Sequence, residues 1–71
     1  MAKIPGLSGD DLIKALKKAG FRFVRQRGIH ISLENGPYRT VVPLHDELSR
    51  GTLLAILKQC GLSKEDLLKL L

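Results

Sequence analysis

The 71-residue sequence predicts one small α+β domain, in which a helix precedes three antiparallel strands and a second helix follows them, with a short extra helix at the C-terminal end. Three observations predict this α-β-β-β-α order. Apolar residues recur at helical spacing near both ends, segments rich in β-branched and aromatic residues fill the middle, and glycine-containing turn signals separate those segments. A chain of this length builds a single core, so residues 1–71 are expected to form one domain.

The first helix is expected to begin after Ser8, behind a short lead-in over residues 1–7. Ser8 can cap the helix, and Asp11, three residues later, completes a capping-box-like pair. Acidic residues in the first turn and lysines in the last turn favour the helix dipole, and Gly20 supplies a left-handed stop. One apolar face follows at helical spacing and comprises Leu12, Ile13, Leu16 and Ala19.

Three strands joined by two tight turns account for the middle of the chain. The predicted strands cover residues 21–25, 29–33 and 38–42. Phe21 and Phe23 share a face of the first strand and are expected to pack on the helix. Gly28 lies in the first turn, and Asn35-Gly36, a strong hairpin signal, lies in the second.

Two further helices are predicted after the strands. Ser49 is expected to cap a helix over residues 50–60 that ends at Gly61, and Ser63 opens a short last helix with Asp66 three residues on. The last helix is rich in leucine, at Leu67, Leu68, Leu70 and Leu71. Either these side chains fold back onto the core or they offer a surface to a partner, and fold-back is favoured because terminal segments stay ordered only when they are tied down.

With both long helices on one face of the sheet, the opposite face is left open to water or a ligand. Alternation along the second strand directs Ile29, Ile31 and Leu33 to the core and His30, Ser32 and Glu34 to the open face.

The charge balance indicates an anionic partner. The formal net charge is +5, which favours nucleic acid first, an acidic protein second and a membrane surface third, while the bland alternative is that excess lysine aids solubility. No apolar run approaches the ~20 residues that span a bilayer, and the N-terminus lacks the apolar run of a signal peptide, so a cytoplasmic location is expected.

Metal and cofactor chemistry is not expected. The sequence has no phosphate-cradling glycine motif and no motif typical of a serine triad. Cys60 is the only cysteine and falls in an apolar helical pattern, which favours a core position over a nucleophile. His45, with Asp46 and Glu47 after it, could attract a divalent cation, but acidic residues before a helix are explained more simply by the helix dipole.

The strongest chemical signal is His30 beside Arg25 and Arg27. Arginine holds phosphate in bidentate fashion and histidine titrates near neutral pH, so an exposed imidazole between guanidinium groups suits phosphodiester chemistry. RNA carries its own nucleophile, the ribose 2′-OH, so a histidine can serve as general acid or base without a metal. The alternative is an ordinary surface histidine, which is the commoner case for a lone histidine on a strand.

Two sets of residues also match a family pattern. The first half offers a helix followed by Gly20-Phe21 and then Arg25-x-x-Gly28-x-His30. The second half is more specific and reads Val42-Pro43-x-His45, then Leu48-x-x-Gly51-Thr52-Leu53-x-x-Ile56-Leu57-Lys58-Gln59-x-Gly61-Leu62. In these residues, from Leu12 to about Ser63, the chain resembles the HicA toxins of bacterial and archaeal toxin–antitoxin pairs.

The resemblance implies a fold like that of the double-stranded-RNA-binding domain and the activity of a toxin that cleaves mRNA as an endoribonuclease, an mRNA interferase. By the motif match, His30 carries the catalytic role, and a cognate HicB-like antitoxin would cover it. The expected RNA contacts are Arg25, Arg27, Gly28 and Arg39, no cofactor is implied, and a monomer is expected when the chain is free. His45 matches a histidine that is frequent in the family, and a structural role in the loop before the second helix is expected for it.

One residue departs from the family pattern. Ile29 stands where the family usually has a serine before the catalytic histidine. Alternation points Ile29 to the core, where the change alters packing; if that serine orients the histidine or the substrate, the change weakens activity. The alternative functions are therefore a non-catalytic RNA-binding module of double-stranded-RNA-binding type and a protein-interaction domain that docks an acidic partner.

Overall fold

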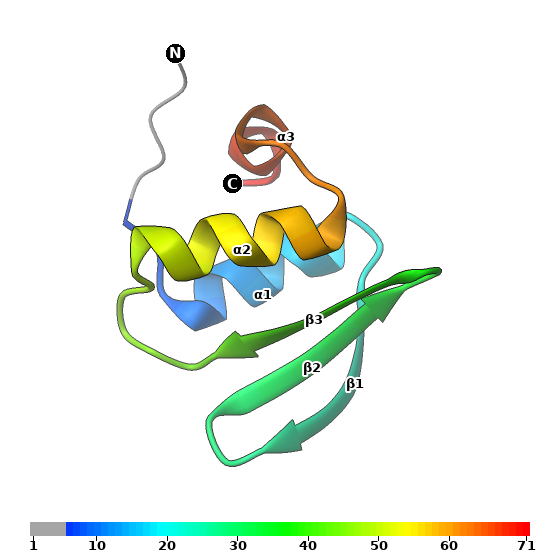
Figure 1. Ribbon diagram of the computed structural model, residues 1–71, viewed down its shortest axis with the longest axis vertical. Coiled ribbons are helices and arrows are strands. Elements are labelled where there is room, and N and C mark those ends of the chain that lie inside the picture. The colour runs from blue at the N-terminus through cyan, green and yellow to red at the C-terminus, as the bar shows by residue number, and fades with distance from the viewer. Residues whose placement is uncertain (1–5) are drawn as a thin grey trace.

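The computed structural model describes residues 6–71, in which one helix precedes three strands and two helices follow them in the chain (Figure 1). The elements are α1 (Gly9–Lys18), β1 (Arg22–Arg27), β2 (His30–Asn35), β3 (Tyr38–Pro43), α2 (Arg50–Cys60) and α3 (Lys64–Leu70). The strands form one antiparallel sheet in the order β1-β2-β3, which confirms the predicted fold class. Most of the predicted lead-in lies outside the described residues.

The predicted capping residues begin all three helices. In α1 the Ser8 hydroxyl accepts from the Asp11 amide at 3.0 Å, and the Asp11 carboxylate accepts from the Ser8 amide at 3.4 Å. Ser63 and Asp66 repeat this reciprocal pair in α3, at 3.1 and 2.9 Å. Ser49 caps α2. These bonds satisfy amides that have no partner within the helix, so the local sequence sets each helix start.

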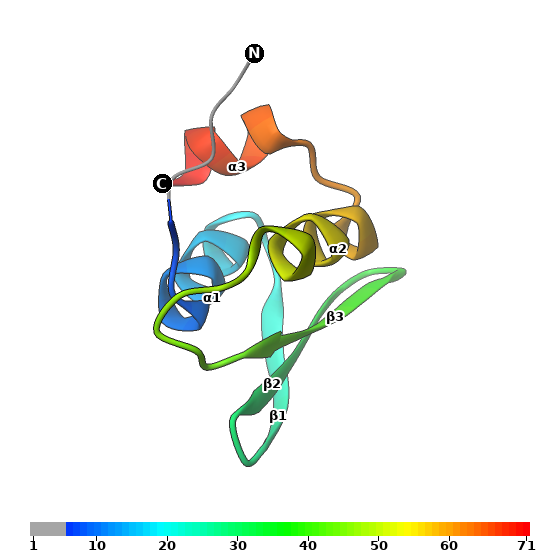
Figure 2. The same ribbon diagram turned by 60° about the vertical axis from the view of Figure 1, so that its left-hand side comes forward.

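The molecule has three layers (Figure 2). The sheet forms one, α1 and α2 lie side by side against it, and α3 covers the side of α1 and α2 that is turned away from the sheet. The side chains that are fully buried between these layers are Leu12, Leu16, Leu33, Val42 and Leu67. Because Leu67 belongs to α3, the C-terminal helix folds back onto the core as predicted.

The sheet differs from the prediction at its first turn. The predicted second strand includes Ile29, but Gly28 and Ile29 form a two-residue turn between β1 and β2, and β2 begins at His30. Gly28 has a φ of +59°, a positive value that glycine adopts without steric cost. Ile29 is 48% exposed, so the prediction that it faces the core is wrong.

The prediction that Phe23 packs on the first helix is also wrong. Phe21 is buried, but Phe23 is 51% exposed. Phe23 pairs with Leu33, whose side chain is in the core, so Phe23 lies on the helix-facing side of the sheet. Both α1 and α2 contact β3, whereas β1 is the opposite edge of the sheet and all of its residues are exposed. The helices therefore leave the inner side of β1 uncovered.

The start of α1 lies against the end of β3. The Gly9 amide donates to the carbonyl of His45 at 2.9 Å, and a Cβ atom built on Gly9 would lie 2.0 Å from the carbonyl oxygen of Pro43. Because the obstacle is backbone, a change of side-chain rotamer cannot relieve it. This close approach requires glycine at position 9.

We expect Gly9→Ala to lower the free energy of unfolding by about 1–3 kcal/mol, the usual cost of overpacking, even though alanine favours a helix over glycine by about 1 kcal/mol. Gly51→Ala is the matched control, because Gly51 also lies in the first turn of a helix and an added Cβ meets nothing within 4 Å. It should be neutral or stabilising. Urea denaturation of both variants beside the wild type measures the difference, and equal effects would contradict the steric argument.

Candidate nucleic-acid interface

The face of the sheet turned away from α1 and α2, called the outer face below, carries three cross-strand rows of side chains. From the β1–β2 turn inward, the rows are Arg27, His30 and Pro43; Arg25, Ser32 and Val41; and Arg22, Glu34 and Arg39. His30 therefore occupies the outer face, and the predicted arginines of β1 stand in its own row and in the next one.

A β-bulge in β1 decides which of its side chains reach the outer face. Phe23 pairs with Leu33 and Arg25 pairs with Ser32, so Val24 is an extra residue in β1. Regular alternation through Val24 would place Arg25 on the same side as Phe23. With the bulge, Val24 and Arg25 both stand opposite Ser32, as bulged pairs do. The bulge thus gathers Arg25 and Arg27 on the face that carries His30.

The strands concentrate the positive charge of the chain. They carry four arginines and one glutamate, a net charge of +3 of the +5 for the whole chain. Glu34 pairs with Arg22 and with Arg39, the latter through a 3.8 Å contact between Nε and Oε2. Within residues 6–71, Arg25 and Arg27 have no ion pair. Among the strand arginines, those without a counter-charge in the described residues therefore lie at the His30 end of the outer face.

The backbone around His30 is held by hydrogen bonds on both sides. The Gln26 side-chain amide donates to the Gly28 carbonyl at 2.9 Å, which closes the turn. The Leu44 amide donates to the Ile29 carbonyl at 2.7 Å, which extends the pairing of β2 with the chain after β3. His30 itself is exposed. An exposed imidazole on a fixed backbone can exchange protons with a ligand on the outer face.

Among the predicted RNA-contacting residues, the structure brings Arg25, Arg27 and Gly28 to the His30 end of the sheet. Arg39 does not join them. It lies two rows away, where Glu34 partly neutralises it. Arg39 therefore does not share the His30 end of the outer face with Arg25 and Arg27.

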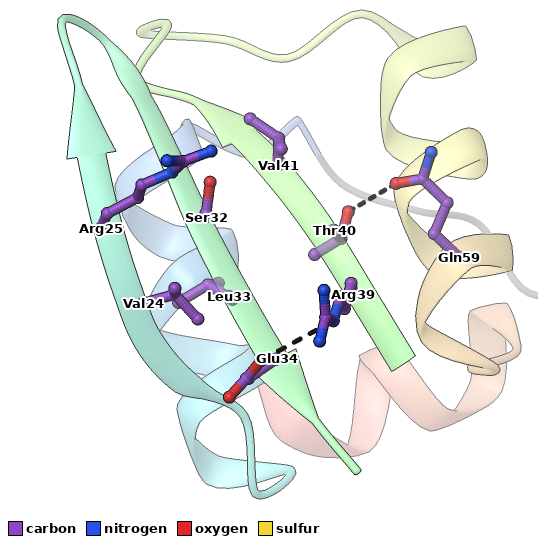
Figure 3. Close-up of a pocket in the computed structure, with 9 residues that line it drawn as sticks. All are labelled: Val24, Arg25, Ser32, Leu33, Glu34, Arg39, Thr40, Val41 and Gln59. Atoms are coloured by element: carbon purple, nitrogen blue, oxygen red, sulfur yellow. Dashed lines mark hydrogen bonds and ion pairs between the residues drawn. The ribbon is translucent and has the colours of Figure 1, made fainter. Parts of the chain in front are cut away.

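A groove of about 620 Å³ begins one row from His30 and runs across the outer face to α2 (Figure 3). Its side chains include Val24, Arg25, Ser32, Arg39, Val41 and Gln59. We call it the Ser32 groove, because the small Ser32 side chain on the central strand lies between larger side chains on β1 and β3. At its far side the buried Thr40 hydroxyl donates to the Gln59 side-chain oxygen at 2.7 Å, which ties β3 to α2.

The sequence prediction did not include Val41, Val24 or Gln59. Val41 could have been found, because an apolar residue on the polar face of the third strand breaks the alternation. Val24 reaches the groove through the bulge, which leaves no mark in the sequence pattern. Gln59 comes from α2, and its position depends on how that helix packs beside β3.

The other candidate groups lie elsewhere. His45 is exposed in the loop after β3, and its structural contact is made by its backbone carbonyl, which accepts from Gly9. Within residues 6–71 no group of three or more histidine, cysteine, aspartate or glutamate side chains is arranged to hold a metal ion. In the same range, no helix has the length and apolar character needed to cross a membrane.

Cys60 is buried in the core, as predicted. Burial raises the pKa of its thiol from 9.0 to about 11, and a hydrogen bond with Thr40 opposes this shift only in part. The thiol therefore stays protonated at neutral pH, and the thiolate that nucleophilic chemistry needs is not formed.

This arrangement, a three-stranded sheet backed by two helices with an exposed basic outer face, defines a small α+β domain whose fold is like that of the double-stranded-RNA-binding domain. The family model described as HicA toxin of bacterial toxin-antitoxin matches residues 9–62, which extend from α1 through α2 and include all three strands. The chain belongs to the HicA toxin family. Searches of curated proteins and of solved structures found no match.

We expect the thiol of Cys60 to react with Ellman's reagent far more slowly in the native chain than in urea at about pH 8, because the native thiol is buried and its pKa is raised. The unfolded state loses this proton at lower pH than the native state does, so the contribution of Cys60 to stability is present below pH 9.0 and declines as the pH rises toward about 11. Equal reaction rates in the native and unfolded chain would contradict the buried position.

Proposed function

We propose that this chain is the toxin of a HicA–HicB pair and that it cleaves mRNA as a metal-independent endoribonuclease, with His30 as the general acid/base. The observation that supports this most is the placement of His30: exposed, on a hydrogen-bonded backbone, beside two arginines that have no counter-charge within the described residues. Membership of the HicA toxin family supports the toxin role.

The reaction uses the nucleophile that RNA supplies. Neutral His30 removes the proton from a ribose 2′-OH, the 2′-oxygen forms a bond to the adjacent phosphorus, and the bond from phosphorus to the 5′-oxygen breaks. The departing 5′-oxygen takes a proton from water, and His30 later returns its proton to water. The products are one fragment that ends in a 2′,3′-cyclic phosphate and one that begins with a 5′-hydroxyl. One positioned general base contributes roughly 10²- to 10⁴-fold in rate.

The arginines stabilise the charge that builds up on the phosphate. Arg27 stands opposite His30 and Arg25 stands one row further along the same face. A guanidinium group holds two phosphate oxygens at once, and groups already in place need no reorganisation during the reaction. Gly28 allows the tight turn that lets Arg27 and His30 face each other across the two strands.

The proposed partner is a HicB-like antitoxin that covers the outer face and His30, with the toxin a monomer when free. A partner with acidic side chains complements the net charge of +3 on the strands. The proposed site of action is the cytoplasm, where mRNA is found.

A non-catalytic RNA-binding module of double-stranded-RNA-binding type is the second candidate, and Ile29 is the observation that favours it. Ile29 directly precedes His30 and is half-exposed at the turn, so it lies at the surface next to His30 rather than in the core. A hydroxyl at this position could orient His30 or the substrate, and isoleucine cannot.

Cleavage of RNA by the purified chain in EDTA tests the proposal. We expect wild type to cut, and His30→Ala to lose at least about 100-fold in rate, the lower end of what a positioned base supplies. His45→Ala is the matched control, because His45 is also exposed but lies in the loop after β3, and it should keep wild-type activity.

Circular dichroism establishes that each variant is folded, and mass spectrometry of the fragments identifies the cyclic phosphate. Equal cleavage by wild type and His30→Ala would contradict the catalytic role of His30. Salt-sensitive RNA binding without cleavage by either chain would instead support the RNA-binding module.

A further inference from the structure

We infer that the Ser32 groove is a subsite that holds one unstacked nucleotide of a single-stranded RNA, next to the phosphodiester bond at His30. The inference rests on the proposed function and deepens it, since it makes single-stranded RNA the substrate class. Four properties of the groove carry it: shape, apolar surface, charge and distance from His30.

The shape fits a planar base. Neighbouring strands of a sheet lie about 4.8 Å apart, so β1 and β3 are separated by about 10 Å across the groove. Ser32 on the central strand fills little of this space, and Val24 and Val41 border it from either side (Figure 3). Each of these valines is 47% exposed. A base placed there covers apolar side chains that otherwise face water.

The polar groups at the edges of the groove suit the rest of a nucleotide. Arg25 and Arg39 stand on opposite strands and can each bind a phosphate oxygen. The Gln59 side-chain oxygen accepts from Thr40, so its NH₂ group is the part available to donate to a ligand. The Ser32 hydroxyl can donate or accept.

The groove lies at a useful distance from His30. Ser32 and His30 are two residues apart on β2 and point to the same face, which separates them by about 7 Å. This is close to the spacing of successive phosphates in an extended RNA strand. A nucleotide in the groove therefore places its neighbouring phosphate beside His30 and Arg27.

A duplex fits this surface poorly. Its bases are stacked and paired inside the helix, so a protein meets sugars, phosphates and base edges. The exposed valines would then cover no base. A single strand can splay one base into the groove and keep its phosphates on the arginine side.

The test measures RNA binding by the full chain carrying His30→Ala, which keeps the RNA intact, using fluorescence anisotropy with a short single-stranded RNA. Adding Val41→Asp should weaken binding about tenfold or more, within the range of losses seen when one base contact is removed. Adding Leu71→Asp is the matched control. It makes the same charge change at an exposed apolar residue outside the groove, and it should weaken binding about threefold at most.

Deletion of Val24 is the second variant. It removes the bulge residue and restores regular alternation, so Arg25 and Arg27 stay on the outer face while one apolar side of the groove is lost. We expect a folded chain by circular dichroism, with single-strand affinity reduced about as much as by Val41→Asp. Unchanged affinity in both groove variants would overturn the inference.

Two further probes decide what the groove binds. The same RNA annealed to its complement should bind at least about tenfold more weakly than the single strand, and equal binding would overturn the single-strand assignment. A 5′-mononucleotide should compete poorly, and competition as strong as that of the RNA would show that the groove takes free nucleotides instead.

These experiments distinguish failure of the groove subsite from failure of the proposed ribonuclease activity. Cleavage that requires His30, together with wild-type affinity in both groove variants, would overturn the subsite and leave the ribonuclease in place. Single-strand binding that depends on Val41 and Val24 in a chain that does not cut RNA would support the subsite and remove the catalytic proposal.

Discussion

The extra residue in β1 is the constraint on which the outer face depends. Two demands meet in that strand: Phe23 stands on the helix-facing side opposite Leu33, while Arg25 and Arg27 stand with His30. Regular alternation through Val24 cannot meet both, and the bulge does so within one strand. Because β1 is an edge strand outside the cover of the helices, the irregularity disturbs no core packing. The basic outer face thus depends on a bulge in β1, the edge strand in which the fold tolerates one.

Sequence reasoning succeeded where the determinants are local. A serine cap with its acidic partner three residues on marks the start of α1 and of α3, and those bonds form between neighbours in the chain. Prediction was weaker in the sheet. The position of Ile29 depends on whether this residue belongs to the turn or to β2. The exposure of Phe23 depends on how much of the sheet the helices cover. Both are tertiary properties, which short-range patterns do not encode.

The candidate site shows the same division. The placement of His30 on a polar strand position beside arginines was predictable, because that pattern is visible in the sequence. The grouping of Arg25 with His30 was predicted from closeness in the chain alone, and the reason it holds is the bulge. The Ser32 groove was not predictable. It joins residues of β1, β2 and β3 with Gln59 from α2, so it exists only once the sheet and α2 are packed together.

The edge position of β1 has a consequence for the protein when it is alone. An unpaired edge strand can template pairing with another copy of the chain, and charged side chains on the edge oppose such growth. Arg22, Arg25 and Arg27 bring three positive charges to this edge, so two copies aligned edge to edge would repel each other. The arginines of β1 therefore also oppose pairing between two copies of the chain. A partner that neutralises these arginines removes the repulsion, so it must also cover the edge of β1 to prevent such pairing.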